Sequence, residues 1–376
     1  MLYALFRYLN ENFGFPLLGM YPSFRIGAAF ATAFVLCLIL GPRFIAWQRR
    51  RSIGEDFSKM GEARRELVDQ KKEGTPTMGG LFVGAALLLS ILLWCRLDSG
   101  LAWTGIVVFL VFLGIGYFDD RQKLFHPTKH GLSFRTKMLL TGVCATLLGL
   151  WLQQGLWSGD LSYLQSLVLP FLKNANPTDA ILPLTALGGI GFIVFLFLAL
   201  AGTANGVNLA DGMDGLAIGC VFCTAFALLG ATYIVGDLRI ASYLYVLHVP
   251  DCKEISVQLG ALLGGSLGFL WFNAAPAQVF MGDVGSLSLG SLLGFSAIAS
   301  RMELSLLIAG GVFVAEVLSV ILQVGSYKLR RKRIFLCAPI HHHFQKMGIP
   351  ETRIVTRFWI VSALLAAFSL LLFKVR

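Results

Sequence analysis

The stretch "LAWTGIVVFLVFLGIGYFDD", residues 101–120, is a mostly apolar run that ends on two adjacent aspartates. The apolar part is about as long as a helix must be to cross a bilayer. Asp119 and Asp120 are unfavourable where they stand, because a helix C-terminus disfavours carboxylates and the two side chains repel each other. The stretch therefore predicts a membrane helix that brings a doubled negative charge to the membrane surface for a functional reason.

The pattern of this stretch recurs along the chain. Of the 376 residues, 56% are hydrophobic and only 14% are charged, whereas soluble proteins carry about 25% charged residues. The apolar residues fall into separate runs, and helices in such runs satisfy their own backbone groups in lipid. We predict an all-α polytopic membrane protein with a single integral-membrane domain, residues 1–376. Ten spans are expected, at about 24–44, 78–96, 101–118, 138–154, 181–201, 216–235, 256–272, 286–300, 304–327 and 357–374.

The basic residues predict the orientation in the membrane. Residues 43–77, 119–137 and 328–357 hold 22 of the 31 Lys and Arg side chains. With ten spans, all three segments fall on one side, which the positive-inside rule identifies as the cytoplasm, and both termini are then periplasmic. The net charge of +10 is explained in this way, so we exclude nucleic acid as a partner. On the other side, Trp157 and Tyr163 favour a short interfacial helix within 155–180.

Most of the unusual polar residues lie in five cytoplasmic segments. Carboxylates, basic side chains and glycines at a membrane surface fit Mg²⁺-dependent phosphoryl transfer, because Mg²⁺ prefers a few carboxylates together with substrate phosphates. We therefore predict a cytoplasmic active-site cleft. The segments are "KKEGTPTMGG" (71–80), "DDRQKLFHPTKHGLSFRTK" (119–137), "NGVNLADGMDG" (205–215), "NAAPAQVFMGDVGS" (273–286) and "APIHHHF" (338–344).

Structural explanations compete with functional ones for several of these residues. Asp211 or Asp214 can cap the following helix, but capping does not explain Asn205 and Asn208 as well, so a nucleotide or metal site is favoured. Asp283 precedes an apolar helix, where it is either a cap or part of a phosphate site.

Aromatic and buried polar residues leave similar alternatives. Phe280 is either a core residue or a stacking face for a base. Three consecutive histidines, residues 341–343, cannot all face one zinc ion, but imidazoles can donate hydrogen bonds to phosphate. Glu316 lies inside an expected span, where a carboxylate is either functional or hydrogen-bonded to a neighbouring helix.

Together, the motifs resemble those of the polyprenyl-phosphate N-acetylhexosamine-1-phosphate transferases, and within that superfamily the branch that transfers phospho-N-acetylmuramoyl-pentapeptide. The resemblance covers nearly the whole chain. It departs from the usual pattern at Gln345, where the family commonly has Glu, and at His126 and Pro127, where lysines are more usual. We expect altered loop contacts and an unchanged reaction. The most specific motifs are "GTPTMGG", "FDD" followed by "GLSFRTK", "NLADGMDGLA", "FNAAPAQVFMGDVGSLSLG" and "PIHHHF".

The resemblance implies a reaction and a place in the cell. Undecaprenyl phosphate would attack the β-phosphate of UDP-N-acetylmuramoyl-pentapeptide, with Mg²⁺ required, to give lipid I and UMP. The enzyme would be a homodimer of ten-helix subunits in the bacterial inner membrane.

The resemblance also assigns residues. The catalytic set would be Asp119, Asp120, Asp283, His342 and His343, with Asp283 a direct Mg²⁺ ligand. Substrate would be bound by Lys72, Asn208, Asp211, Asp214 and Phe280 on the nucleoside side and by Lys123 and Asn273 near the diphosphate. From the residue pattern alone, Asn205 is added to this substrate-binding set.

Two alternatives stay open at this point. A sibling transferase would move N-acetylglucosamine-1-phosphate, although the unbroken "PIHHHF" and "GTPTMGG" disfavour it. A transporter would also have many spans and an intramembrane Glu316, but transporters place their polar residues near the midplane and show inverted repeats. For the transferase, both direct transfer and a two-step route through an aspartyl-phosphate are possible.

Overall fold

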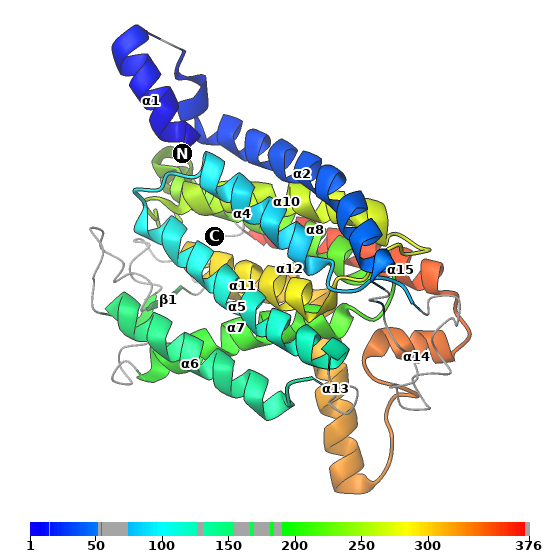
Figure 1. Ribbon diagram of the computed structural model, residues 1–376. Helices are drawn as coiled ribbons and strands as arrows, with labels where there is room; N and C mark the ends of the chain where they lie inside the picture. The colour runs from blue at the N-terminus through cyan, green and yellow to red at the C-terminus, as the bar shows by residue number, and fades with distance from the viewer. Residues whose placement is uncertain are drawn as a thin grey trace.

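The structure, a computed structural model, is a bundle of helices with one small hairpin (Figure 1). It describes residues 1–14, 16–51, 54, 74–125, 131–153, 166–168, 181–183 and 190–372. Lys72 lies outside these ranges, as do His126, Pro127, Trp157 and Tyr163. A single 3-10 turn covers Leu17–Met20. The helices are α1 (Leu2–Phe13), α2 (Pro22–Arg50), α4 (Gly80–Trp94), α5 (Gly100–Phe125), α6 (Phe134–Gln153), α7 (Ile190–Ala210), α8 (Leu216–Gly236), α9 (Leu238–Tyr243), α10 (Cys252–Asn273), α11 (Gly282–Ser300), α12 (Glu303–Ala309), α13 (Gly311–Arg330), α14 (Ile340–Lys346) and α15 (Glu351–Leu371).

The length and hydropathy of the helices confirm a polytopic membrane protein. Within the described residues, eight helices are long and apolar enough to cross a membrane: α2, α5, α7, α8, α10, α11, α13 and α15. The two remaining predicted spans correspond to α4, an apolar helix of 15 residues, and α6, a helix of 20 residues. All the lipid-length elements are helical, as expected for a chain that must satisfy its backbone groups without water.

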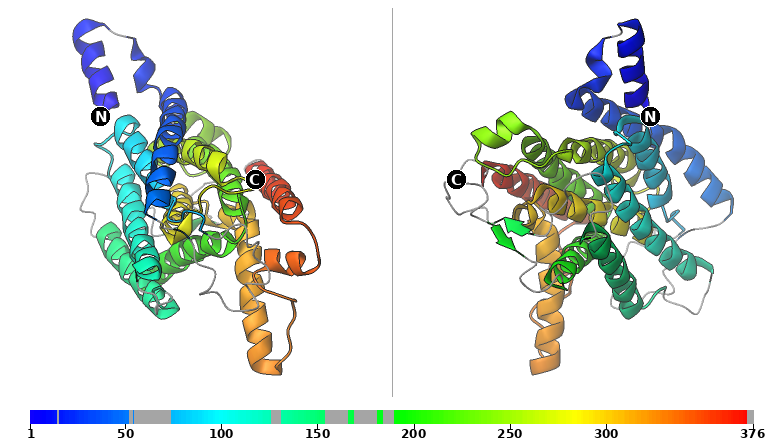
Figure 2. Two further views of the ribbon diagram at one scale, coloured as in Figure 1. Left: turned by 45° about the vertical axis from the view of Figure 1, so that its right-hand side comes forward. Right: turned by 90° about the vertical axis from the view of Figure 1, so that its left-hand side faces the viewer.

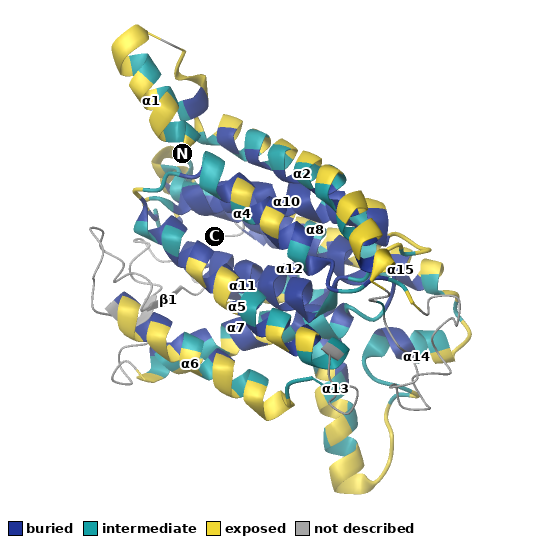
Figure 3. Cartoon of the chain, viewed as in Figure 1, coloured by how far each residue is buried: buried dark blue, intermediate teal, exposed yellow. Residues whose placement is uncertain are grey.

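The centre of the bundle consists of α8, α10 and α11 (Figure 3). Nearly every residue of α11 is buried although the helix is rich in serine. These hydroxyls donate back to carbonyls of their own helix, for example from Ser288 to Val284 and from Ser296 to Leu292, both at 2.7 Å. Back-bonding of this kind lets polar side chains enter an apolar core. At Gly290 a methyl group would lie 2.7 Å from the Thr203 carbonyl oxygen, so close packing of α11 on α7 requires glycine there.

Two helices extend beyond their predicted spans into the polar motifs. The span predicted at 101–118 continues as α5 to Phe125, so Asp119, Asp120 and Lys123 are helical residues. The span predicted at 181–201 is shifted, because β2 (Ile181–Pro183) occupies its start and α7 runs from Ile190 to Ala210. Polar side chains at these ends do not stop a helix whose backbone hydrogen bonds can continue.

Other elements also differ from the sequence-based expectation. Within 155–180, the described residues Ser166–Val168 form β1, which pairs antiparallel with β2, where an interfacial helix was expected. The span predicted at 304–327 is divided at Gly310 into α12 and α13. The C-terminal part of α13 extends away from the bundle (Figures 1 and 2). The amphipathic α1, which the sequence did not predict, lies at the end of the bundle where α2 begins.

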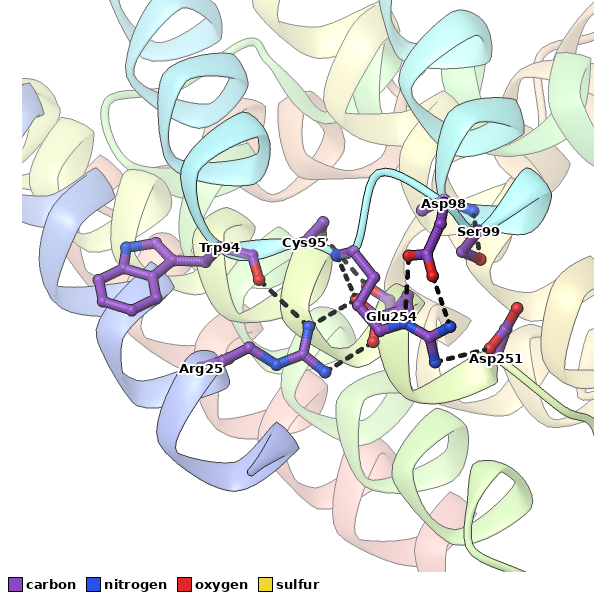
Figure 4. Close-up of polar contacts among 9 residues, drawn as sticks. Arg25, Trp94, Cys95, Asp98, Ser99, Asp251 and Glu254 are labelled. Carbon is purple, nitrogen blue, oxygen red and sulfur yellow. Dashed lines mark hydrogen bonds and ion pairs between the residues drawn. The ribbon is translucent and has the colours of Figure 1, made fainter. Parts of the chain in front are cut away.

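A buried ion pair lies at the end of the bundle where α2 begins (Figure 4). Arg25 of α2 donates from both terminal nitrogens to Glu254 of α10, at 2.7 and 2.6 Å. The Arg96 backbone N–H donates to the same carboxylate at 2.8 Å, and the Arg96 side chain pairs with Asp98 and Asp251. These five residues, named the Arg25 cluster below, join α2, α10 and the α4–α5 connection.

Candidate active site

Three buried carboxylates converge from two helices. Asp119 and Asp120 lie on α5 and Asp283 lies in the first turn of α11. One carboxylate oxygen from each lies within 4.8 Å of the others. The structure therefore brings Asp283 to the adjacent pair Asp119 and Asp120, although a long stretch of chain separates it from them.

Two glycines allow this approach. At Gly116, one turn before the aspartates, a methyl group would lie 2.3 Å from the Asp283 carbonyl oxygen. Gly282 has φ 75°, a left-handed conformation that favours glycine, and a methyl group there would lie 2.5 Å from Asp120 Oδ2. The helices α5 and α11 approach closely because glycine has no side chain at these two positions. This close approach determines where the carboxylates meet.

Two lysines lie among these carboxylates. Lys123 Nζ is 2.6 Å from Asp119 Oδ2, 3.2 Å from Asp120 Oδ1 and 3.0 Å from Asp283 Oδ1. Lys137, from the first turns of α6, places its Nζ 3.0 Å from Asp119 Oδ2 and also pairs with Asp283 Oδ2. Asp119, Asp120, Asp283, Lys123 and Lys137 are called the carboxylate–lysine cluster below. Within the described residues, three carboxylates face two ammonium groups, so with every group ionised the cluster has an excess of one negative charge.

Backbone N–H groups orient two of the carboxylates. The Leu132 N–H donates to Asp119 Oδ1 at 2.6 Å, and the Val284 N–H donates to Asp120 Oδ2 at 3.0 Å. The second donor belongs to the first turn of α11, where the helix dipole favours negative charge. The carboxylate of Asp120 therefore lies at the N-terminus of α11, which is also a favourable position for phosphate.

The cluster meets the requirements of a magnesium site. Mg²⁺ binds through one or two carboxylates, waters and substrate phosphates and does not need a closed protein cage. The converging oxygens and the uncompensated negative charge supply the carboxylate part of such a set. Asp283, with Asp119 and Asp120 beside it, is suited to hold the ion, and the lysines are suited to contact phosphate.

The "NGVNLADGMDG" segment adjoins the cluster through Asn208. Its side-chain nitrogen donates to Ser286 Oγ at 2.8 Å, one turn after Asp283 on α11. Asn205 donates instead to the Ala201 carbonyl of its own helix at 2.7 Å. Asp211 is half-buried just beyond the end of α7. The structure thus brings Asn208 close to the carboxylates but directs the Asn205 amide along α7.

Asp214 and Asn273 hold two motif segments together. Asp214 Oδ2 accepts from the Ala277 N–H at 3.0 Å. Asn273 accepts from the Gly215 N–H at 3.0 Å and donates to the Val279 carbonyl at 2.9 Å. Both side chains therefore join the 211–215 turn to the 274–280 segment.

The half-buried Phe280 lies where a third motif joins this arrangement. Its N–H donates to the Pro76 carbonyl at 2.8 Å, and its own carbonyl accepts from the Gly79 N–H at 2.8 Å. The "GTPTMGG" motif thereby runs alongside the residues that lead into α11. Lys72, just before that motif, lies outside the described residues.

The three histidines do not share one direction. A methyl group at Gly212 would lie 2.4 Å from His341 Nε2 and 3.4 Å from His342 Nε2, so these two rings face the 205–215 segment. His343 Nδ1 accepts from the Leu336 N–H at 3.2 Å, and its ring packs edge-on against Phe335. The sequence selected His342 and His343, whereas the pair that faces the acidic motif consists of His341 and His342.

The sequence reasoning overlooked two residues of this site, Lys137 and His341. Lys137 was quoted within "GLSFRTK" without a role, although a lysine in the first turns of a helix opposes the helix dipole and was a usable signal. His341 lies next to the pair that the resemblance assigns, and the direction of each ring cannot be read from the sequence. Its partner Glu316 had been noted, but a contact between α13 and α14 is not readable from spacing.

Comparisons with known proteins show the family of the chain. They define first a class, the membrane-embedded transferases of glycosyl transferase family 4, whose family model matches residues 102–301. A phospho-N-acetylmuramoyl-pentapeptide-transferase signature matches residues 72–82. The chain is 43% identical over 382 residues to the phospho-N-acetylmuramoyl-pentapeptide-transferase of Solidesulfovibrio magneticus, with all of both chains covered. It is 42% identical over 375 residues to the enzyme of that name from Koribacter versatilis, covering 98% of this chain and 97% of the relative. The chain belongs to the phospho-N-acetylmuramoyl-pentapeptide-transferases of glycosyl transferase family 4.

Proposed function

We propose that the chain transfers phospho-N-acetylmuramoyl-pentapeptide from its UDP-linked donor to undecaprenyl phosphate, giving lipid I and UMP in peptidoglycan synthesis. The observation that carries the proposal is the carboxylate–lysine cluster at the ends of two apolar helices. A lipid phosphate and a soluble nucleotide can meet at such a place, because the lipid tail stays in the bilayer while its phosphate reaches the cluster.

In the proposed reaction, an oxygen of the acceptor phosphate forms a bond to the β-phosphorus of the donor. The bond between that phosphorus and the bridging oxygen breaks, and UMP leaves with the electron pair. A phosphate monoester has a second pKa of about 6 and is largely ionised at neutral pH. The acceptor therefore needs orientation more than deprotonation, and Asp119 is placed to orient it or to take up a residual proton.

The lysines supply charge compensation in this scheme. Lys123 and Lys137 each contact more than one carboxylate, so either ammonium can turn toward a diphosphate oxygen without leaving the cluster. Once donor binding has placed them, these ammonium charges stabilise the transition state without further reorganisation during the chemical step. Mg²⁺, held by Asp283 with Asp119 and Asp120 beside it, would neutralise charge on the diphosphate when bound.

The remaining polar residues are proposed to bind the donor. Asn208, Asp211, Asp214 and Phe280 would form the nucleoside side with Lys72 and Asn205, and Asn273, His342 and His343 would line the diphosphate side. Asp214 and Asn273 support this assignment because they join the segments that carry these groups. His341 is added to the diphosphate side because its ring faces Gly212 together with that of His342.

We also propose the arrangement in the membrane. The chain forms one domain of ten spans in the bacterial inner membrane, with both termini periplasmic, the cleft cytoplasmic and two subunits in a homodimer. The basic segments near the carboxylate–lysine cluster support this orientation. A cysteine introduced at Leu329, which is 85% exposed, should react with a membrane-impermeant maleimide only from the cytoplasmic side, and one at Tyr243, which is 77% exposed, only from the periplasmic side. Chemical crosslinking in native membranes tests the dimer.

One assay tests the activity and its main rival. UMP release is measured from UDP-N-acetylmuramoyl-pentapeptide with and without undecaprenyl phosphate and Mg²⁺, and in parallel from UDP-N-acetylglucosamine. We expect release only with the muramoyl donor, the lipid and the ion together. Release from UDP-N-acetylglucosamine would favour the sibling transferase. Lipid-independent release of UMP from the muramoyl donor would support the two-step route.

A further inference from the structure

Glu316 is a buried carboxylate that the proposed reaction does not use. It is 0% exposed on α13 and faces the start of α14. Its Oε1 lies 3.1 Å from His341 Nδ1, and its Oε2 accepts the Ile340 N–H at 3.0 Å. Both oxygens are therefore engaged by the short helix that carries the histidines.

The contact with His341 determines how that ring is presented. An ionised carboxylate only accepts hydrogen bonds, so Nδ1 of His341 is the donor in this pair. Nε2, on the opposite edge of the ring, is then fixed facing Gly212. Within the described part of the chain, this buried nitrogen has no hydrogen-bond partner, and a buried polar atom of this kind is costly unless a ligand engages it.

The neighbouring histidine is held differently. His342 Nδ1 lies 3.0 Å from the amide oxygen Oε1 of Gln345, which is on the same short helix. His341 is instead anchored from outside α14, by a residue of a membrane helix. The His341 ring is therefore tied to the position of α13.

We infer that Glu316 is the positioning residue of His341: the ring, protonated on both nitrogens, donates from Nδ1 to Glu316 and from Nε2 to a phosphate oxygen of the nucleoside diphosphate donor. The inference rests on the proposed function, since the diphosphate is the ligand of that function. Ligand-orienting carboxylates behind a histidine act in this way in other sites, where their loss reduces activity by about 10-fold to 100-fold. The competing explanation is that Glu316 only caps α14.

A double-mutant cycle separates these two roles. The variants are Glu316→Gln, which keeps the volume but removes one acceptor and the charge, His341→Ala, and both together. We expect Glu316→Gln to lower kcat by about tenfold with less than about twofold change in KM for the donor. In the His341→Ala background the same substitution should change kcat by less than about twofold, because its effect passes through the missing ring.

A control on the same helix is Ser319→Ala. Ser319 is buried and donates to the Glu316 carbonyl at 2.7 Å, without touching His341, so its kcat should be unchanged. An equal loss of kcat in both backgrounds, or an unchanged kcat in Glu316→Gln, would overturn the inference. If Glu316→Gln does not fold, Glu316→Asp replaces it in the cycle and is judged by the same criterion. A wild-type protein that releases no UMP would instead refute the proposed function.

Discussion

The two buried charge clusters of this protein lie near opposite ends of α5, about 30 Å apart by helix rise. In the Arg25 cluster, one guanidinium meets one carboxylate through two short hydrogen bonds, and the outer residues Asp98 and Asp251 are more exposed. In the carboxylate–lysine cluster, three buried carboxylates share two ammonium groups. The buried Arg25–Glu254 pair is balanced in charge, and the additional carboxylates of that cluster lie at its more exposed rim. The carboxylate–lysine cluster instead buries all three of its carboxylates. Burial alone therefore does not mark a functional charge, whereas a buried surplus of carboxylates does.

The largest expected effect comes from Asp283→Asn in the unbalanced cluster. Removing this carboxylate takes away the proposed metal ligand and a partner of both lysines, so we expect UMP release to fall by more than about 100-fold. Mg²⁺ titration of the residual activity should show weakened activation. Ser288→Ala, one turn further along α11, is the matched control and should keep wild-type activity. Unchanged Mg²⁺ activation in Asp283→Asn would refute the assignment of the ligand.

Glu254→Gln, in the balanced Arg25–Glu254 pair, should lower the stability of the protein and leave its kcat unchanged. It leaves Arg25 buried without its counter-charge, and breaking a buried pair in this way costs about 3–5 kcal/mol of stability. Thermal unfolding in detergent should show a lower midpoint, while the folded fraction keeps the wild-type kcat. Joint replacement of Arg25 and Glu254 by methionine should recover most of the loss, since no uncompensated charge is left. A loss of kcat at unchanged stability would contradict the comparison.

Lys137→Met tests how the surplus negative charge of the carboxylate–lysine cluster affects the Mg²⁺ requirement and the transfer rate. One ammonium fewer makes the cluster more negative, so we expect the apparent Mg²⁺ requirement to fall severalfold. Transfer should nevertheless drop by about tenfold, because a group that faces the diphosphate is lost. Both quantities come from one Mg²⁺ titration of initial rates. A raised Mg²⁺ requirement would mean that Lys137 supports the ion site and does not compete with it.

The smallest effect is expected at the rim of the Arg25 cluster, from Asp98→Asn. The side-chain hydrogen bonds from Arg96 hold the pKa of Asp98 below its usual range. The ionised form is therefore stabilised by folding, and that contribution is present above the unfolded pKa of about 3.9 and is lost as pH falls through the folded pKa. Because the pair is exposed, we expect a loss of about 0.5 kcal/mol at pH 7. Unfolding midpoints of both proteins should converge as the pH falls below the folded pKa of Asp98, and a gap that widens at low pH would reverse the assigned sign.

The sequence predicted a helical polytopic membrane protein and selected Asp119, Asp120 and Asp283, which the structure brings together, for a reason visible at Asp119 and Asp120. Hydropathy is a local property, and a charge at the end of an apolar run is conspicuous there. The same reasoning should have flagged Arg25, which lies inside the span predicted at 24–44. It did not, because an arginine near a span end is usually explained by the membrane surface, and its partner Glu254 is 229 residues away.

By itself, the sequence determined that this chain is a helical membrane protein, that its basic segments alternate with apolar spans, and which motifs are the candidates to carry its chemistry. Only the tertiary structure decided that Asp283 meets Asp119 and Asp120, that Lys137 joins them, and that His341 rather than His343 faces Gly212. The physical reason is that composition and periodicity are properties of neighbouring residues. Contacts between helices depend instead on how glycines and small side chains let distant segments approach, and no local pattern records the partner.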